Sequence, residues 1–230
     1  MSQQPDLPAL GVLISGRGTN LGALIEAIDA GRLCARIAVV ISNRPGAPGL
    51  ERARAAGIET LVLNHREYAT RDAFDAALAG ALSGRGVRLV CLAGFMRLIG
   101  APMLNAFPHA ILNIHPSLLP AFPGVDAQRQ ALEHGVRVSG VTVHLVTQEL
   151  DGGPIILQAA VPVLEDDTPD TLSARILLEE HRLYPEAVAI VLGGGWRVKG
   201  RRFLVRAGGW GQEIRRSDVS GQKIGKASGD

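Results

Sequence analysis

The sequence predicts an open, twisted and mostly parallel β-sheet with helices on both faces. Two observations support this fold class. Short apolar runs alternate with helix-like patterns through the first half of the chain, as in sheets whose parallel strands are joined by helical crossovers. Two later apolar runs, at 141–146 and 155–163, follow each other across a Gly-rich loop with no helix between them, which predicts a β-ribbon added to the open sheet. With 230 residues, 47% of them apolar, the chain can bury a substantial core.

The first half of the chain supplies the alternating elements. Five apolar runs predict strands at 10–15, 37–42, 60–63, 87–93 and 110–114. Apolar spacing and turn residues predict four helices: one after the turn at 16–18 that stops at Gly31, one that ends at Gly57, one at 70–82 and one at 101–106. This order is the one expected of a parallel sheet.

The second half ends in a long helix and a basic segment. Residues 168–192 predict a closing helix with Asp167 or Thr168 as its N-cap, and residues 196–205 predict one weak strand. From Arg197 onward there are nine Lys/Arg against three Asp/Glu, although the whole chain has a net charge of only +2. We therefore expect one folded domain over residues 1–206 and a disordered, basic, Gly-rich tail over 207–230.

Composition argues against several classes of protein. The small net charge disfavours a protein built to bind nucleic acid, and no apolar run reaches membrane-spanning length. Cys34 and Cys91 lie in apolar, strand-like contexts and are expected to be buried free thiols of a reduced compartment. No His/Cys spacing suggests a metal site. We expect a cytoplasmic protein that uses no metal.

A glycine-rich turn joins the first strand to the first helix in Ser15-Gly-Arg-Gly-Thr-Asn20. Glycines let the backbone approach an anion closely, and a helix N-terminus offers unpaired N–H groups. The turn lacks the third glycine of a dinucleotide fingerprint and the lysine of a P-loop. It favours a small phosphorylated molecule over NAD or ATP, although a plain tight turn capped by Thr19 is an open alternative.

Polar side chains interrupt the predicted strand at 110–114 and its end. Asn113 and His115 are two residues apart and project on the same side, where an amide and an imidazole suit the stabilisation of an oxyanion. Asp151, in Glu-Leu-Asp-Gly-Gly-Pro, would raise the pKa of His115 if it reached the ring. His144 lies on the next predicted strand and is a candidate for a supporting role. The alternatives are a buried histidine satisfied by backbone and an aspartate that forms a turn.

These motifs together resemble the folate-dependent formyltransferases. The resemblance rests on Leu13-Ile-Ser-Gly-Arg-Gly-Thr-Asn-Leu21, Leu92-Ala-Gly-Phe-Met-Arg97, Leu112-Asn-Ile-His-Pro-Ser-Leu-Leu-Pro120, Leu150-Asp-Gly-Gly-Pro-Ile155 and Glu180-His-Arg-Leu-Tyr-Pro185. It spans roughly residues 10–192 and places the catalytic domain in residues 1–206. It implies transfer of a formyl group from 10-formyltetrahydrofolate, a co-substrate, to the amine of glycinamide ribonucleotide in purine biosynthesis.

The resemblance also implies roles for particular residues. Asn113 and His115 would stabilise the tetrahedral intermediate, and Asp151 would raise the pKa of His115 and help remove the amine proton. The remaining implied contacts fall into two groups. The substrate-binding residues are Gly18, Thr19 and Asn20 for the phosphate and Glu180 for the glycinamide end; the folate-binding residues are Arg71, Met96, Arg97, Leu98, Ile99, Asn113, Thr147 and Asp151.

Two departures from the family and two alternative functions accompany this interpretation. Ala121 stands where the family usually has a basic residue, so either one phosphate or ribose contact is missing or Arg17 or Arg129 compensates, and Gln128 stands where a His is common. The loop at 119–122 resembles that of formyltetrahydrofolate deformylases, but those lack a glycine loop of the present type and carry an additional N-terminal domain. A non-catalytic nucleotide-binding module would have no need of Asn113 and His115. The oligomeric state, including a homodimer, is left open.

Overall fold

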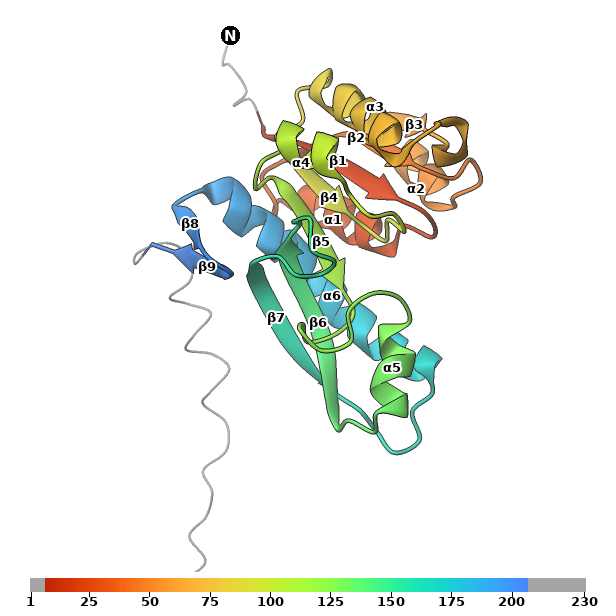
Figure 1. The fold of residues 1–230 in the computed structure, drawn as a ribbon, viewed down its shortest axis with the longest axis vertical. Coiled ribbons are helices and arrows are strands. Elements are labelled where there is room, and N and C mark those ends of the chain that lie inside the picture. Colours follow the sequence, from red (N-terminus) through yellow and green to blue (C-terminus); the bar gives the residue numbers. More distant parts are fainter. Residues whose placement is uncertain (1–6, 207–230) are drawn as a thin grey trace, which may run out of the picture.

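The computed structural model describes residues 7–206, which fold around one mixed sheet (Figure 1). Within this range the sheet has nine strands in the order β3-β2-β1-β4-β5-β6-β7-β9-β8. The first five strands in this order run parallel, and β6 is antiparallel to β5 and to β7. The predicted fold class is therefore confirmed, including the antiparallel ribbon.

The predicted elements of the first half all form, with ends shifted by a few residues. The strands are β1 (Ala9–Ile14), β2 (Arg36–Ser42), β3 (Thr60–Val62), β4 (Leu89–Leu92) and β5 (Ile111–His115), and the helices are α1 (Thr19–Asp29), α2 (Gly49–Ala55), α3 (Arg71–Ser83) and α4 (Ala101–Ala106). In the second half the ribbon is β6 (Val138–Leu145) and β7 (Ile155–Pro162), followed by α6 (Pro169–Gly193). The Thr168 side chain caps α6, as one of the two predicted caps.

Two hydrophobic cores lie on opposite faces of the sheet because successive strand residues point in opposite directions. On one face α1, α2 and α6 cover Val12, Val40 and Leu112, and on the other α3 and α4 cover Leu13 and Ile41. Strands β1, β2 and β4 are apolar on both faces, as expected of buried parallel strands. The result is a three-layer domain.

The chain order along the sheet reverses between β1 and β4, which are neighbours. The connections that leave the carboxyl ends of β1 and β4 run in opposite directions. Open α/β sheets bind ligands in the crevice formed where two neighbouring connections diverge in this way. The turn after β1 and the segment after β4 stay close, since Ser15 N–H donates to Gly94 O at 3.0 Å.

The structure differs from the sequence prediction at four places. It contains α5 (Ala127–Glu133) and a 3-10 turn, η1 (His65–Glu67), which were not predicted because both are too short to show a clear period. The weak strand predicted at 196–205 is a hairpin, β8 (Trp196–Lys199) and β9 (Arg202–Val205), since Gly200 adopts a positive φ at the turn.

The fourth difference concerns the cysteines, which were both predicted to be buried. Cys91 is buried, but Cys34 is exposed. The tail predicted at 207–230 lies outside the described residues. Among residues 7–206, no helix is long and apolar enough to cross a membrane.

Candidate active site

A cavity of about 850 Å³, here called the larger cavity, opens at the carboxyl ends of β4 and β5. All the residues predicted to act in catalysis or to bind folate line it. Those residues are Arg71, Met96, Arg97, Leu98, Ile99, Asn113, His115, Thr147 and Asp151. Segments far apart in the sequence therefore line one cavity.

Asp151 is the centre of the polar wall of the larger cavity. Its Oδ2 lies 3.5 Å from Nδ1 of His115, and its Oδ1 lies 3.4 Å from Nδ2 of Asn113 and 3.7 Å from Nε2 of His144. The Gly124 N–H also donates to Asp151 Oδ2 at 2.7 Å. Only 9% of the Asp151 side chain is exposed, so these contacts act where water screens little.

Strand register brings His144 to this group. In the antiparallel pair of β5 and β6, Asn113 lies opposite His144 and His115 lies opposite Thr142. Residues opposite each other on one face of such a pair are close enough to interact. The register is a tertiary feature, which explains why the sequence could suggest His144 only as a supporting candidate.

Backbone geometry fixes the Asp151 loop against β6. Asp151 itself has a φ of 48°, a left-handed conformation that costs free energy for a residue with a side chain. A Cβ at Gly153 would lie 1.7 Å from the carbonyl oxygen of Leu145, so only glycine allows the loop to approach the strand this closely. The Gly-Gly pair thus holds the carboxylate over β5.

Carbonyl contacts determine which ring nitrogens carry protons. His115 Nε2 lies 2.8 Å from the Phe122 carbonyl and His144 Nδ1 lies 3.0 Å from the Leu145 carbonyl. A carbonyl can only accept, so each of these nitrogens donates. When the rings are neutral, Nδ1 of His115 presents a lone pair to Asp151, and Nε2 of His144 accepts from the Asn113 amide at 3.2 Å.

Burial and neighbouring charges set the protonation of this wall. Burial lowers the pKa of His115, and the contacts with Phe122 and Asp151 only partly offset it. Burial alone would raise the pKa of Asp151, but His144, the Gly124 N–H and His115 together lower it. Asp151 therefore favours the charged imidazole, as predicted, but desolvation is the larger effect and the net pKa of His115 is lowered.

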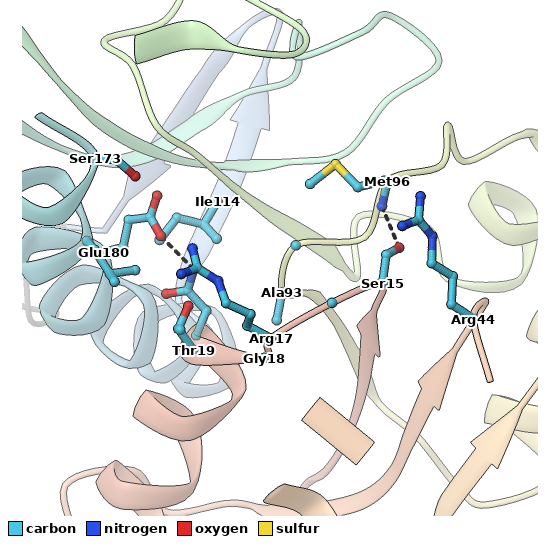
Figure 2. Close-up of a pocket in the computed structure, with 14 residues that line it drawn as sticks. Ser15, Arg17, Gly18, Thr19, Arg44, Ala93, Met96, Ile114, Ser173 and Glu180 are labelled. Carbon is cyan, nitrogen blue, oxygen red and sulfur yellow. Dashed lines mark hydrogen bonds between the residues drawn. The ribbon is translucent and has the colours of Figure 1, made fainter. Parts of the chain in front are cut away.

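A second cavity of about 330 Å³, the smaller cavity, lies where β1 meets α1 (Figure 2). Its floor is the glycine turn, and Gly18, at a φ of 68°, is the N-cap of α1. No side chain of the described chain caps this helix end, which corrects the alternative that Thr19 does so. The first N–H groups of α1 are therefore available to an anion, with the Arg17 and Arg44 side chains at the same cavity.

Glu180 of α6 closes the other side of the smaller cavity. Its carboxylate accepts a hydrogen bond of 2.7 Å from Asn20, and Figure 2 labels Glu180 among the residues that line this cavity. Burial raises the pKa of Glu180, and the bond from Asn20 opposes that shift. A buried carboxylate that faces a cavity can accept hydrogen bonds from a polar ligand.

The two cavities are adjacent and share three lining residues, Gly94, Met96 and Ile114. A molecule in one cavity can therefore reach a molecule in the other. Gly18, Thr19, Asn20 and Glu180, the predicted substrate-binding residues, all line the smaller cavity. The predicted site residues thus fall into two groups, one for each cavity.

Some lining residues were not anticipated and some suggested ones lie elsewhere. Arg44 and Ser173 line the smaller cavity but carry no motif that would reveal them. Arg17 lines it too, whereas Arg129 is exposed on α5 and Ala121 is exposed outside both cavities. Within residues 7–206, no cluster of three or more His, Cys, Asp or Glu side chains could hold a metal ion.

An open, mostly parallel sheet that places Asn113, His115 and Asp151 together beside a glycine turn with free helix N–H groups is the arrangement of an α/β group-transfer enzyme. A family model described as "Formyl transferase" matches residues 10–188, and the chain belongs to that family. Within it, the chain groups with the phosphoribosylglycinamide formyltransferases. That enzyme of Escherichia coli (strain K12) is 42% identical over 86% of this chain and 91% of its own length.

Further relatives agree with this assignment. The structure of glycinamide ribonucleotide transformylase 1 from Symbiobacterium toebii superposes with a TM-score of 0.86 and 59% identity, covering 89% of this chain and 97% of that one. The human trifunctional purine biosynthetic protein adenosine-3 is 49% identical over 80% of this chain. The present chain spans only 18% of that protein's length, and 20% or less of the other trifunctional relatives that it matches.

Proposed function

We propose that this chain transfers the formyl group of 10-formyltetrahydrofolate to the amine of glycinamide ribonucleotide, a step of purine biosynthesis. The observation that carries the proposal is the meeting of Asn113, His115 and Asp151 at one wall of the larger cavity, directly beside the smaller cavity with its free helix N–H groups. Family membership supports the formyl-transfer chemistry. The two adjacent cavities support two substrates bound side by side.

The larger cavity suits a folate. Its volume lies in the range of small-molecule sites, and its walls combine apolar residues such as Phe95 and Val146 with peptide groups of residues 147–151 that can pair with a pterin ring. Arg71 and Arg97 also line it and can meet the carboxylates of a folate tail. The apolar side chains of Met96, Leu98 and Ile99 supply contact area, and no metal is needed for this binding.

The smaller cavity suits the ribonucleotide. The phosphate would accept hydrogen bonds from the backbone of Gly18 and from Thr19 and Asn20 at the start of α1. Glu180 would accept hydrogen bonds from the polar end of the molecule, and the amine would then point across Met96 and Ile114 into the larger cavity.

The proposed chemistry is direct attack without a covalent enzyme intermediate. The amine nitrogen forms a bond to the formyl carbon, the carbonyl electrons become an oxyanion, and the bond from that carbon to the folate N10 then breaks. The Asn113 amide and the His115 ring stabilise the oxyanion, whose negative charge raises the pKa of His115 and lets Nδ1 take up a proton. Asp151 removes the amine proton, directly or through water, and the proton on Nδ1 of His115 passes to the folate N10 as that nitrogen leaves.

The test is a spectroscopic assay with 10-formyltetrahydrofolate in the presence and absence of glycinamide ribonucleotide. We expect tetrahydrofolate to form only when the amine substrate is present. Turnover without it would instead identify a deformylase, and no turnover in folded protein would overturn the enzyme proposal. Asp29→Asn is a matched control for active-site carboxylate variants, because Asp29 is exposed at the end of α1.

A further inference from the structure

Residues 94–100, here called the bridging segment, separate the two cavities. Gly94 and Met96 line both cavities, whereas Arg97, Leu98 and Ile99 line only the larger one. The segment leaves β4 at the point where the strand order reverses, and it contains no helix or strand. A movement of its backbone would therefore change the shape of both cavities at once.

Ser15 attaches the beginning of the bridging segment to the glycine turn. Its hydroxyl accepts a hydrogen bond of 2.8 Å from the Met96 N–H, which Figure 2 draws as a dashed line between these two residues. The same hydroxyl donates to Asn43 Oδ1 at 2.7 Å. Because an amide oxygen can only accept, the Ser15 proton points to Asn43 and its lone pair points to Met96.

The contact between Ser15 and Met96 is buried, and Asn43 supports it through a further polar contact. Ser15 is 4% exposed and Asn43 is 2% exposed, so water does not compete for either bond. The Asn43 Nδ2 lies 3.3 Å from Nδ1 of His65, which extends the polar chain to η1. The serine is thus held in a single orientation by its neighbours.

The far end of the bridging segment has a comparable attachment on the other side of the larger cavity. Gly100 N–H donates to Asp75 Oδ2 at 2.5 Å, and Asp75 is fully buried on α3. The residues between the two attachments present large exposed side chains, with Met96 at 61% and Leu98 at 53% exposure. Ligands thus contact a short stretch of chain that is fixed at both ends.

We infer that Ser15 is a positioning residue that couples the two substrate sites, because it ties the turn that binds the phosphate to the segment that lines the folate cavity. The inference rests on the proposed function. A ligand in either cavity orders the exposed residues between the two attachments, and the second ligand then binds to a segment whose middle is already ordered. Such coupling is reciprocal and typically amounts to about 5- to 150-fold in affinity.

The experiment measures binding of two molecules that cannot react with each other, tetrahydrofolate and glycinamide ribonucleotide, to the full chain by isothermal titration calorimetry. In the unmodified protein we expect a saturating concentration of either molecule to tighten the binding of the other by at least about fivefold. The coupling ratio is the Kd of one molecule measured alone divided by its Kd in the presence of the other. In Ser15→Ala we expect this ratio to fall close to one, while each molecule alone still binds. A purely structural role for Ser15 would weaken binding or stability without changing the ratio.

Two further variants complete the test. Ser139→Ala is the matched control, because Ser139 is equally buried on β6 and its hydroxyl has no partner among the described residues. It should keep the full ratio. Ser15→Cys keeps the shape but provides a poor acceptor, so it replaces Ser15→Ala if the alanine variant fails to fold.

Either of two results would overturn the inference: no coupling in the unmodified protein, or unchanged coupling in the Ser15 variants. Turnover is measured on the same samples. Catalytic turnover combined with unchanged coupling would overturn only the role of Ser15, whereas loss of the proposed function would appear as no turnover in any sample.

Discussion

The two cavities are adjacent but are built from different parts of the chain. The smaller cavity depends on backbone: a turn with Gly18 in a left-handed conformation and the free N–H groups at the start of α1. The larger cavity depends on buried ionisable side chains, with Asp151 held between His115 and His144. Because of this difference, a steric change should impair binding in the smaller cavity, whereas the loss of one charge should impair the chemistry in the larger cavity.

The largest expected effect is that of Asp151→Asn. This substitution keeps the shape but removes the charge, and loss of a proton-transferring group typically costs about 10²- to 10⁴-fold in rate. We expect kcat to fall within that range while the KM for the ribonucleotide changes little. Steady-state assays alongside Asp29→Asn would check this, and a comparable loss in that control would contradict the assignment.

The next effect is that of Gly18→Ala, which tests the backbone site. A Cβ at this position would lie 2.9 Å from Gly49 Cα, and the φ of 68° disfavours any side chain. We expect a loss of stability of about 1–3 kcal/mol and a raised KM for the ribonucleotide, with kcat affected less. Gly16→Ala is the control for folding, because a Cβ at Gly16 meets no atom within 4 Å. Equal destabilisation by both substitutions would contradict the steric explanation.

A smaller effect concerns the titration of His115. Its pKa is lowered by burial, so the free enzyme should hold a neutral ring at neutral pH and should gain a proton at a lower pH than an ordinary histidine does. Asp151 favours the charged ring, and Asp151→Asn should therefore move the titration to still lower pH. NMR of the imidazole resonances, assigned with His115→Ala, would measure both values. A higher pKa in the asparagine variant would show that the carboxylate does not act on the ring.

The smallest effect is expected outside both cavities, at Gly80. This residue is exposed within α3, and a Cβ there would meet no atom within 4 Å. Gly80→Ala should stabilise the protein by about 0.5–1 kcal/mol, because alanine loses less backbone entropy on folding. Chemical denaturation and turnover would be measured together. A change in kcat would contradict the view that the site depends only on the two cavities.

Local patterns in the sequence determined the strands and the longer helices of this protein. The glycine turn, the polar strand end at Asn113 and His115, and the Asp-Gly-Gly loop were all visible, because each breaks an apolar period or requires a special backbone conformation. The resemblance to a family then grouped the site residues into two sets. The short helix α5 was missed, since its pattern is too brief to distinguish from a loop, and the hairpin of β8 and β9 was predicted only as one weak strand.

Tertiary structure decided the rest. The register of β5 against β6 placed His144 beside Asn113, and the approach of two loops at the sheet's reversal point joined Ser15 to Met96. The net direction of the pKa shift at His115 also depended on burial, which no local pattern reports. Spacing along a chain specifies which residues share a face of an element, whereas pairing, burial and the balance of charge arise only when separate elements pack together.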